Sequence, residues 1–231
     1  MTTWQVGPLL IPEAAVATVI ALVAAYLYVR YFTLYQGSAG YRPRDRAVNV
    51  LILIGFVYAF GTVLLNLTLF LSDPMAVLSY PSGPGEFILA LCAAGIYIAV
   101  QHWKKGIDVR ELFAVLLYIV LAAQIVYAVW TRESGTSING PLPFAEHPIA
   151  FYTTAVSVAL LFWLHRLGEK IQRSAQLSVV GAAWAFSQWL IMRVDAVPQL
   201  LMVYVPAASF LILSIVMAVM SILLTIIHKR R

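Results

Sequence analysis

The chain has 231 residues, of which 62% are hydrophobic and only 11% are charged, and its mean hydropathy is +0.87. Charged groups this scarce cannot coat a soluble domain of this length, so lipid is the expected solvent. We interpret the net charge of +5 as a signal that orients the protein in the membrane, so no nucleic-acid partner is expected. The single cysteine, Cys92, cannot form a disulfide or a dithiol redox pair within the chain.

Seven apolar runs approach the roughly 20 residues that a bilayer-spanning helix needs. They predict an all-α membrane protein with seven transmembrane helices in a single polytopic domain, residues 1–231, without a soluble domain or an internal repeat. The third, fifth and sixth runs are short and are expected to recruit flanking residues. In chain order the predicted spans are Pro8–Val29, Ala47–Leu71, Phe87–Trp103, Leu112–Trp130, Ile149–Leu164, Leu177–Met192 and Val205–Ile227.

The basic residues gather in alternate connections between these runs and at the C-terminus. Only Arg132 and Arg193 of the 15 lysines and arginines fall in the other connections. Because short cytoplasmic loops carry an excess of Lys and Arg, the N-terminus is predicted outside and the C-terminus in the cytoplasm. The first span is not expected to be a cleaved signal peptide, because its positive charges follow the apolar run.

Three neutral polar residues, Asn66, Gln124 and Gln188, are predicted near the middle of spans, where no Asp, Glu, Lys or Arg falls. This lack of charge argues against a proton-coupled or ion-coupled transporter. Hydrogen bonding between helices is the simpler role for such amides, at about 1 kcal/mol or less each.

The histidines do not predict a metal or haem site. His102, His165 and His228 are all expected at cytoplasmic helix ends, which disfavours axial haem ligation at mid-depth. An outer metal site would have to combine His147 with Glu146 or Glu133, and no spaced ligand motif supports one. Neither a metal nor another cofactor is therefore expected.

The longest outer connection, residues 131–147, separates the fourth and fifth spans and is rich in polar side chains. A further outer stretch, 196–204, is amphipathic and is predicted to lie in the membrane interface. The charged side chains of the outer connections are expected to be solvated: Glu86, Arg132, Glu133, Glu146, Arg193 and Asp195.

Four outer segments, taken in chain order, suggest a family. They are "VGPLLIP" (6–12), "LFLSDPMAVLSYPSGPGEFILAL" (69–91), "LPFAEHPIAFY" (142–152) and "VVGAAWAFSQWLIMRVDA" (179–196). In order and spacing the chain resembles bacterial prolipoprotein diacylglyceryl transferase, an enzyme with seven spans and the same orientation. The resemblance covers nearly the whole length and rests on glycine, proline and aromatic positions, with His147-Pro148 and Tyr152 as the best retained matches.

The resembling family transfers diacylglycerol from phosphatidylglycerol to the cysteine thiol of a lipoprotein precursor, and it carries three charged motifs for this chemistry. All three are degraded in this chain. The segment Gly83–Glu86 lacks the family's histidine, and Arg132 stands where the family has an acid. Neutral or aromatic side chains stand at the other family positions: Ala123, Gln124, Tyr127, Trp130, Thr153, Trp184 and Gln188.

These replacements leave three hypotheses open. The first is a catalytically degenerate relative that acts as a phospholipid-binding or assembly subunit, with a cleft formed by Gln124, Tyr127, Trp130, Tyr152, Trp184 and Gln188. The second is an active transferase in which Arg132 and Arg193 hold the phosphate and His147 or Glu146 is the base. The third is a membrane anchor for an extracytoplasmic redox partner.

Beyond a bound phospholipid, the resemblance implies a lipoprotein or another membrane subunit as partner. It also implies the bacterial cytoplasmic (inner) membrane as the location of a multi-pass protein.

Overall fold

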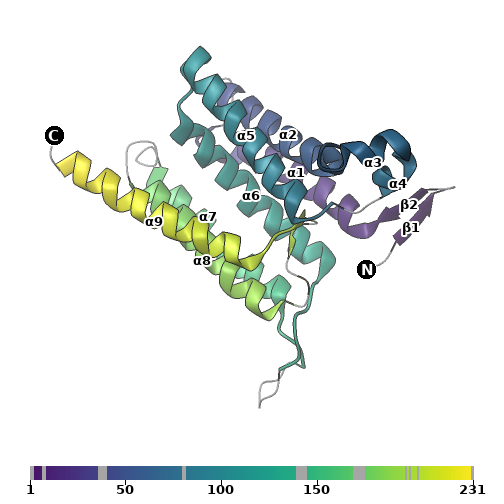
Figure 1. Ribbon diagram of the computed structural model, residues 1–231. Coiled ribbons are helices and arrows are strands. Elements are labelled where there is room, and N and C mark those ends of the chain that lie inside the picture. The colour runs from purple at the N-terminus through teal and green to yellow at the C-terminus, as the bar shows by residue number, and fades with distance from the viewer. Residues whose placement is uncertain are drawn as a thin grey trace.

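The computed structural model describes residues 3–6, 9–35, 41–79, 82–138, 145–168, 175–195, 197, 199–201 and 203–229. Nearly all regular structure in these residues is helical (Figure 1). Two short antiparallel hairpins accompany the helices, β1 (Thr3–Val6) with β2 (Leu9–Pro12), and β3 (Gln199–Leu200) with β4 (Val203–Tyr204). The helices are α1 (Glu13–Phe32), α2 (Tyr41–Leu65), α3 (Leu67–Ser72), α4 (Pro74–Ser79), α5 (Pro84–Lys105), α6 (Val109–Thr131), α7 (Ile149–Leu167), α8 (Gln176–Val194) and α9 (Ala207–Lys229).

Six of the described helices are long and apolar enough to cross a membrane: α1, α2, α5, α6, α7 and α8. The chain is therefore an all-α, multi-pass membrane protein, as the composition predicts. The helix α9 matches the seventh predicted span in position and has 23 residues, of which Ala207–Leu223 form its described apolar part. The short third, fifth and sixth runs do recruit flanking residues, and α5, α7 and α8 reach 22, 19 and 19 residues.

Two predicted spans have wrong boundaries. The first helix begins at Glu13 and not at Pro8, because Leu9–Pro12 pairs with β1 as an extended strand. The second predicted span is interrupted at Asn66, which leaves the helical conformation with φ −127° and ψ 45°. The amide of Asn66 donates a hydrogen bond to the Thr62 carbonyl oxygen (3.1 Å), and asparagine side chains that bond to the backbone compete with helix continuation.

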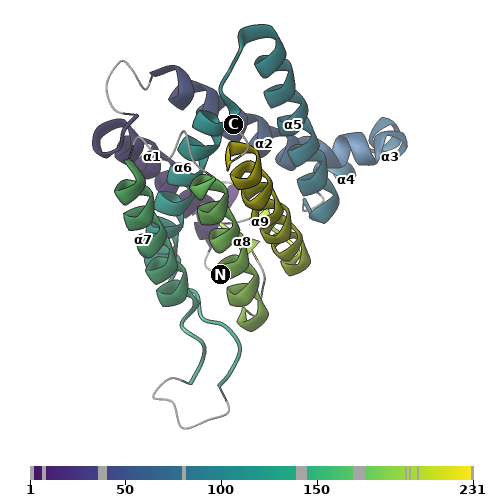
Figure 2. The ribbon, with the colours of Figure 1, turned by 90° about the vertical axis from the view of Figure 1, so that its left-hand side faces the viewer.

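The long helices alternate in direction. The indole of Trp130, at the end of α6, donates to the Glu13 carboxylate at the start of α1 (3.2 Å). The Tyr28 hydroxyl near the end of α1 is hydrogen-bonded to His165 near the end of α7 (2.5 Å). The starts of α1 and α7 and the ends of α6 and α8 therefore share one end of the bundle, which we call the outer end (Figures 1 and 2).

The helices α8 and α9 form an antiparallel hairpin. The Ser214 hydroxyl of α9 donates to the Ala182 carbonyl oxygen in α8 (3.0 Å). The Ser221 hydroxyl of α9 donates to the Ala175 carbonyl oxygen (3.2 Å). Ala175 directly precedes α8, so the two helices lie side by side over nearly the whole of α8, as Figure 1 shows.

The core is built around α6. In the most apolar 18-residue stretch of α6, 67% of the residues are buried. This share is much larger than in the corresponding stretches of α1, α2 and α5. A stripe of small residues on α1, Ala17, Ala21 and Ala25, is fully or almost fully buried in the same core cluster, and small side chains at this spacing let helices approach closely. The other long helices expose large apolar side chains such as Phe56, Phe151 and Phe162, as expected for surfaces that face lipid.

Candidate functional site

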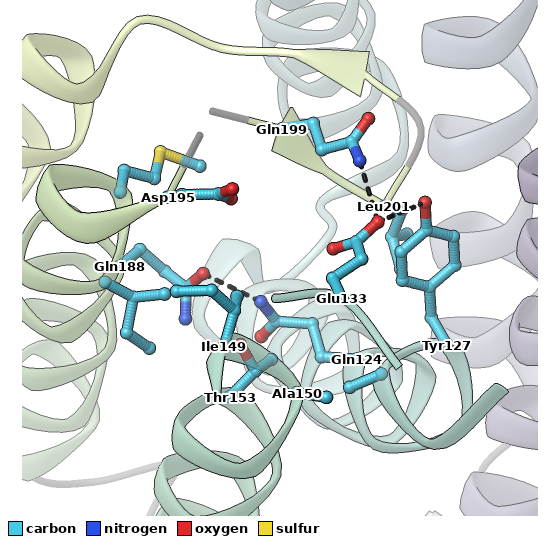
Figure 3. Close-up of a pocket in the computed structure, with 13 residues that line it drawn as sticks. Gln124, Tyr127, Glu133, Ile149, Ala150, Thr153, Gln188, Asp195, Gln199 and Leu201 are labelled. Carbon is cyan, nitrogen blue, oxygen red and sulfur yellow. Dashed lines mark hydrogen bonds between the residues drawn. The ribbon is translucent and has the colours of Figure 1, made fainter. Parts of the chain in front are cut away.

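A buried polar cluster lies between α6 and α8 (Figure 3). The Gln124 amide nitrogen donates to the Gln188 side-chain oxygen (2.9 Å), and the Trp184 indole nitrogen donates to the Gln124 side-chain oxygen (2.9 Å). Gln124 and Gln188 are each only 3% exposed. The structure thus brings together three residues of the predicted cleft that are up to 64 positions apart in the chain.

These three side chains form a hydrogen-bond chain with one direction. An indole N–H only donates, so the oxygen of the Gln124 amide must face Trp184 and its NH₂ group must face Gln188. The Gln188 oxygen accepts that bond, and the Gln188 NH₂ group is therefore directed elsewhere. It is buried and has no hydrogen-bond partner within the described residues. Trp184 alone sets the orientation of both amides.

Two members of the cluster, Gln124 and Gln188, line a small cavity of about 20 Å³. The lining comes from α6, the start of α7, the end of α8 and the hairpin β3–β4 (Figure 3). A buried water needs roughly 10–15 Å³, so this space holds about one water-sized group. It is far too small to enclose a phospholipid.

Glu133 is the ionisable residue that closes the outer side of the cavity. One carboxylate oxygen, Oε1, accepts both from the Gln199 amide of β3 (2.7 Å) and from the Tyr127 hydroxyl of α6 (3.2 Å). Burial, followed by the negative charge of Asp195, raises the pKa of Glu133, and the hydrogen bonds from Tyr127 and Gln199 offset only part of that rise. Glu133 therefore holds a proton more strongly than a solvated glutamate does.

We expect Glu133 to make the stability of the protein depend on pH. Its pKa is raised above the ordinary value of 4.5 in the folded state, so the fold binds the proton more tightly than the unfolded chain. The stability that Glu133 contributes is then fully present below pH 4.5 and is lost as the pH rises through the folded-state pKa. Replacement of Glu133 by Gln removes this loss, which unfolding curves of both proteins in nanodiscs across a pH series would measure. Parallel pH profiles for the two proteins would contradict the expectation.

The backbone after α6 explains how Glu133 reaches the cavity. The last residue of α6 is Thr131, and the next residue, Arg132, turns the chain with a left-handed φ of 49°. The Arg132 N–H still bonds to the Ala128 carbonyl oxygen (3.0 Å). A cation at a helix C-terminus is favoured by the helix dipole. The next residues are fixed by backbone bonds from Gly135 to His147 (2.8 Å) and from Thr136 to Val194 (2.8 Å). The side chain of Glu133 is thus held between the ends of α6 and α8.

Tyr127 also belongs to the cavity, but the other two predicted cleft residues lie elsewhere. Trp130 is 40% exposed and bonds to Glu13, on a different face of α6. The hydroxyl of Tyr152 is within 3.5 Å of His147 Nδ1 and does not line the cavity. The predicted cleft of six residues therefore divides into three buried residues, Gln124, Tyr127 and Gln188, the half-buried Trp184 bonded to them, and two residues elsewhere.

The four residues proposed for an active enzyme do not converge. Arg193 lies over the ring of Trp189, 5.2 Å from its centroid, and Arg132 is exposed. Glu146 is also exposed and forms an isolated β-bridge with Ser137, whereas His147 contacts Tyr152. All four residues are described, and no hydrogen bond or ion pair of the structure joins any two of them.

Three charged residues were wrongly predicted to be solvated, and one of them, Asp195, is partly buried in the lining of the cavity. Glu86 is only 8% exposed, and its carboxylate accepts bonds from the Thr62 hydroxyl (3.0 Å) and from the Gly83 N–H (2.8 Å), as in a capping box. Glu133 is half-buried in the cavity wall. The described part of the outer stretch 196–204 forms the β3–β4 hairpin, which carries Gln199 to the cavity.

An open groove lies at the outer end of α6, apart from the cavity. It measures about 580 Å³ and is lined by Ile125, Val126, Val129, Trp130 and Arg132. Apolar side chains form its inner part, and one arginine stands at its outer end. Apolar surface packs against acyl chains, and a cation pairs with an anionic head group. The lining of the groove is therefore chemically complementary to both parts of an anionic phospholipid.

The two sites differ in what they can do chemically. The described lining of the cavity holds carboxylates and amides but no cation, whereas the groove presents a cation beside apolar surface. In the described residues, no group of three or more His, Cys, Asp or Glu side chains could hold a metal ion. No family model, no curated protein and no solved structure matches this chain.

Proposed function

We propose that this chain is a phospholipid-binding membrane protein without transferase chemistry, built on an architecture like that of prolipoprotein diacylglyceryl transferase. The observation that carries the proposal is the contrast between the two sites: a small cavity of about 20 Å³ beside Gln124 and Gln188, and a more open groove of about 580 Å³ that ends in Arg132. The resemblance adds a lipoprotein or another membrane subunit as the partner for which the protein is a scaffold.

The proposal includes seven spans, with the N-terminus outside the bacterial cytoplasmic membrane. Support for the seventh span comes from α9, whose 23 residues would extend about 34 Å and whose hairpin with α8 gives it the same depth. Support for the orientation comes from the described basic residues at the inner end of the bundle, such as Arg44, Lys104 and Arg166.

The absence of transfer chemistry is supported by the charge around the cavity. An anionic phosphate donor needs fixed cations beside the reacting group. Glu133 and Asp195 line this cavity, and the arginines Arg132 and Arg193 are both exposed outside it. The described lining of the cavity therefore offers no fixed cation to a phosphate.

Lipid binding is supported by the depth order of the groove residues. Ile125 and Val126 lie more than one turn before the end of α6, and Val129 lies two residues before it, so all three belong to the apolar span. Trp130 has its indole N–H bonded at the level of Glu13, and tryptophan prefers the membrane interface. Arg132 is the outermost of the five, directly after the last residue of α6, where a cation could pair with a lipid phosphate.

The charge of Arg132 should decide which lipids stay bound. We expect the Arg132→Gln protein to retain an anionic phospholipid about fivefold less strongly than the unmodified protein, since one basic residue at a membrane surface contributes about 1 kcal/mol. Native mass spectrometry after exchange into nanodiscs that contain anionic and zwitterionic phospholipid would measure the retained lipid.

Arg193→Gln is the matched control, because it removes the same charge from the same end of the bundle, where Arg193 lies over Trp189. It should leave the retained lipid unchanged. An equal loss in both variants would show that only the general surface charge attracts lipid. A second assay offers labelled phosphatidylglycerol and a lipobox peptide to the purified protein, and any enzyme-dependent transfer of diacylglycerol would overturn the proposal.

A further inference from the structure

The face of α6 that forms the floor of the open groove continues towards the inner end of the bundle. Four residues share this face, because they follow one another at helical spacing: Tyr118, Ala122, Ile125 and Val129. At the outer end Val129 is 61% exposed, and Ile125 is partly buried. Further inwards Ala122 is 7% exposed and Tyr118 is 0% exposed. The face is therefore open at the outer end of α6 and closed before Tyr118.

Side chains of α1 and α7 close this face at its inner end. The rings of Tyr118 and His165 are in edge contact, with their centroids 5.5 Å apart. The Tyr28 hydroxyl of α1 is hydrogen-bonded to the same histidine ring (2.5 Å), and the Tyr28 and His165 rings are perpendicular. Since α1 and α7 both pack against α6, this contact joins the two helices beside Tyr118. We call the contact between Tyr28 and His165 the α1–α7 bridge.

The open part of the face is about as long as one lipid leaflet is deep. From Ala122 to its last residue, Thr131, α6 rises about 14 Å at about 1.5 Å per residue. The hydrocarbon core of a bilayer is about 30 Å thick, so one leaflet supplies about 15 Å. An acyl chain that enters beside Arg132 therefore meets the closed part of the face after roughly the depth of its own leaflet.

We propose that the groove holds one acyl chain of an anionic phospholipid from the leaflet at the outer end, and that the α1–α7 bridge stops this chain before Tyr118. The inference rests on the proposed function, in which Arg132 holds the head group of the same lipid. It adds two residues that determine how deep the chain reaches, Tyr28 and His165, although neither of them lines the groove.

A phosphatidylglycerol with a photoreactive diazirine at the end of one acyl chain measures this depth. The chain is chosen long enough to reach Tyr118 when extended, and the full chain of the protein is irradiated in nanodiscs that contain the probe. Mass spectrometry after proteolysis then gives the labelling ratio of Tyr118 to Ile125. We expect Tyr118 to be labelled about tenfold less than Ile125, because an acyl chain forced into packed space is disfavoured by roughly that factor.

Two variants open the bridge from opposite sides. His165→Ala removes the ring beside Tyr118, and Tyr28→Ala removes the hydrogen-bond partner of that ring. Each variant should raise the labelling ratio about tenfold, since the packed space becomes accessible to the end of the chain. Phe162→Ala is the matched control, because it removes an exposed aromatic ring from α7 that takes no part in the bridge. The ratio should stay unchanged in this control.

The outcomes separate this inference from the function on which it rests. A phosphatidylcholine probe with the same chain should label Ile125 less than the phosphatidylglycerol probe does, and equal labelling by both probes overturns the proposed function. Comparable labelling of Tyr118 and Ile125 in the unmodified protein overturns the stop, and so does a ratio that stays low in both bridge variants. A low ratio that rises in either bridge variant but not in Phe162→Ala supports it.

Discussion

Replacement of Gly135 by alanine should strongly destabilise the protein, by about 3 kcal/mol. Gly135 is buried between the end of α8 and the start of α7, and a Cβ atom at this position would overlap the Val194 carbonyl oxygen and approach the Ile149 side chain to 2.9 Å. The Val194 carbonyl is backbone and accepts from the Thr136 N–H (2.8 Å), so it cannot move without the loss of a hydrogen bond. Unfolding curves in detergent micelles would measure the loss.

The matched control is Gly95→Ala in α5. No atom lies within 4 Å of the Cβ position at Gly95, so this substitution meets no steric obstacle. Alanine in a helix interior is favoured over glycine by roughly 0.5–1 kcal/mol, so the control should be neutral or slightly stabilising. If Gly135→Ala unfolds at the same denaturant concentration as the unmodified protein, the close approach of the two segments is not as the structure has it.

Replacement of Gln124 by leucine should have the second-largest effect, a loss of about 2 kcal/mol. Gln124 is the middle member of the hydrogen-bond chain, so its removal leaves the Trp184 N–H without an acceptor and the Gln188 oxygen without a donor. Gln188→Leu should cost less, within about 1 kcal/mol, because it strands only the Gln124 NH₂ group and also removes the NH₂ group that is already unpaired.

The double variant of Gln124 and Gln188 separates this explanation from simple loss of packing. With both amides gone, only the Trp184 N–H is left without its partner, so the double variant should be no less stable than Gln124→Leu alone. The free energies of unfolding of the four proteins form a double-mutant cycle. Additive losses would mean that the two amides do not depend on one another.

Hydropathy and charge predicted the general architecture of the chain. Long apolar runs have few alternatives in lipid, because only helices satisfy every backbone group within one segment. The errors lie at places where a local bond overrides hydropathy. Leu9–Pro12 is apolar enough to begin a span but pairs with β1, and the Asn66 amide, bonded to the Thr62 carbonyl oxygen, accompanies a break within an apolar run.

The candidate site could be predicted only in part. The amides Gln124 and Gln188 are conspicuous because polar residues are rare in spans, and the resemblance placed Trp184 beside them. Glu133 and Gln199 gave no such signal, since both occur in connections where polar side chains are ordinary. Their position depends on the left-handed turn at Arg132 and on the β3–β4 hairpin, and neither has a distinctive local sequence.

Trp184 touches two parts of the molecule at once. Its indole N–H holds Gln124, and its ring meets the edge of Phe210 on α9, with ring centroids 5.7 Å apart and planes at 83°. A tilt of α9 that dragged this ring would misalign the indole from the Gln124 oxygen and free both amides to rotate. The position of α9 is therefore linked through Trp184 to the buried amides, although none of the described residues of α9 lines the cavity.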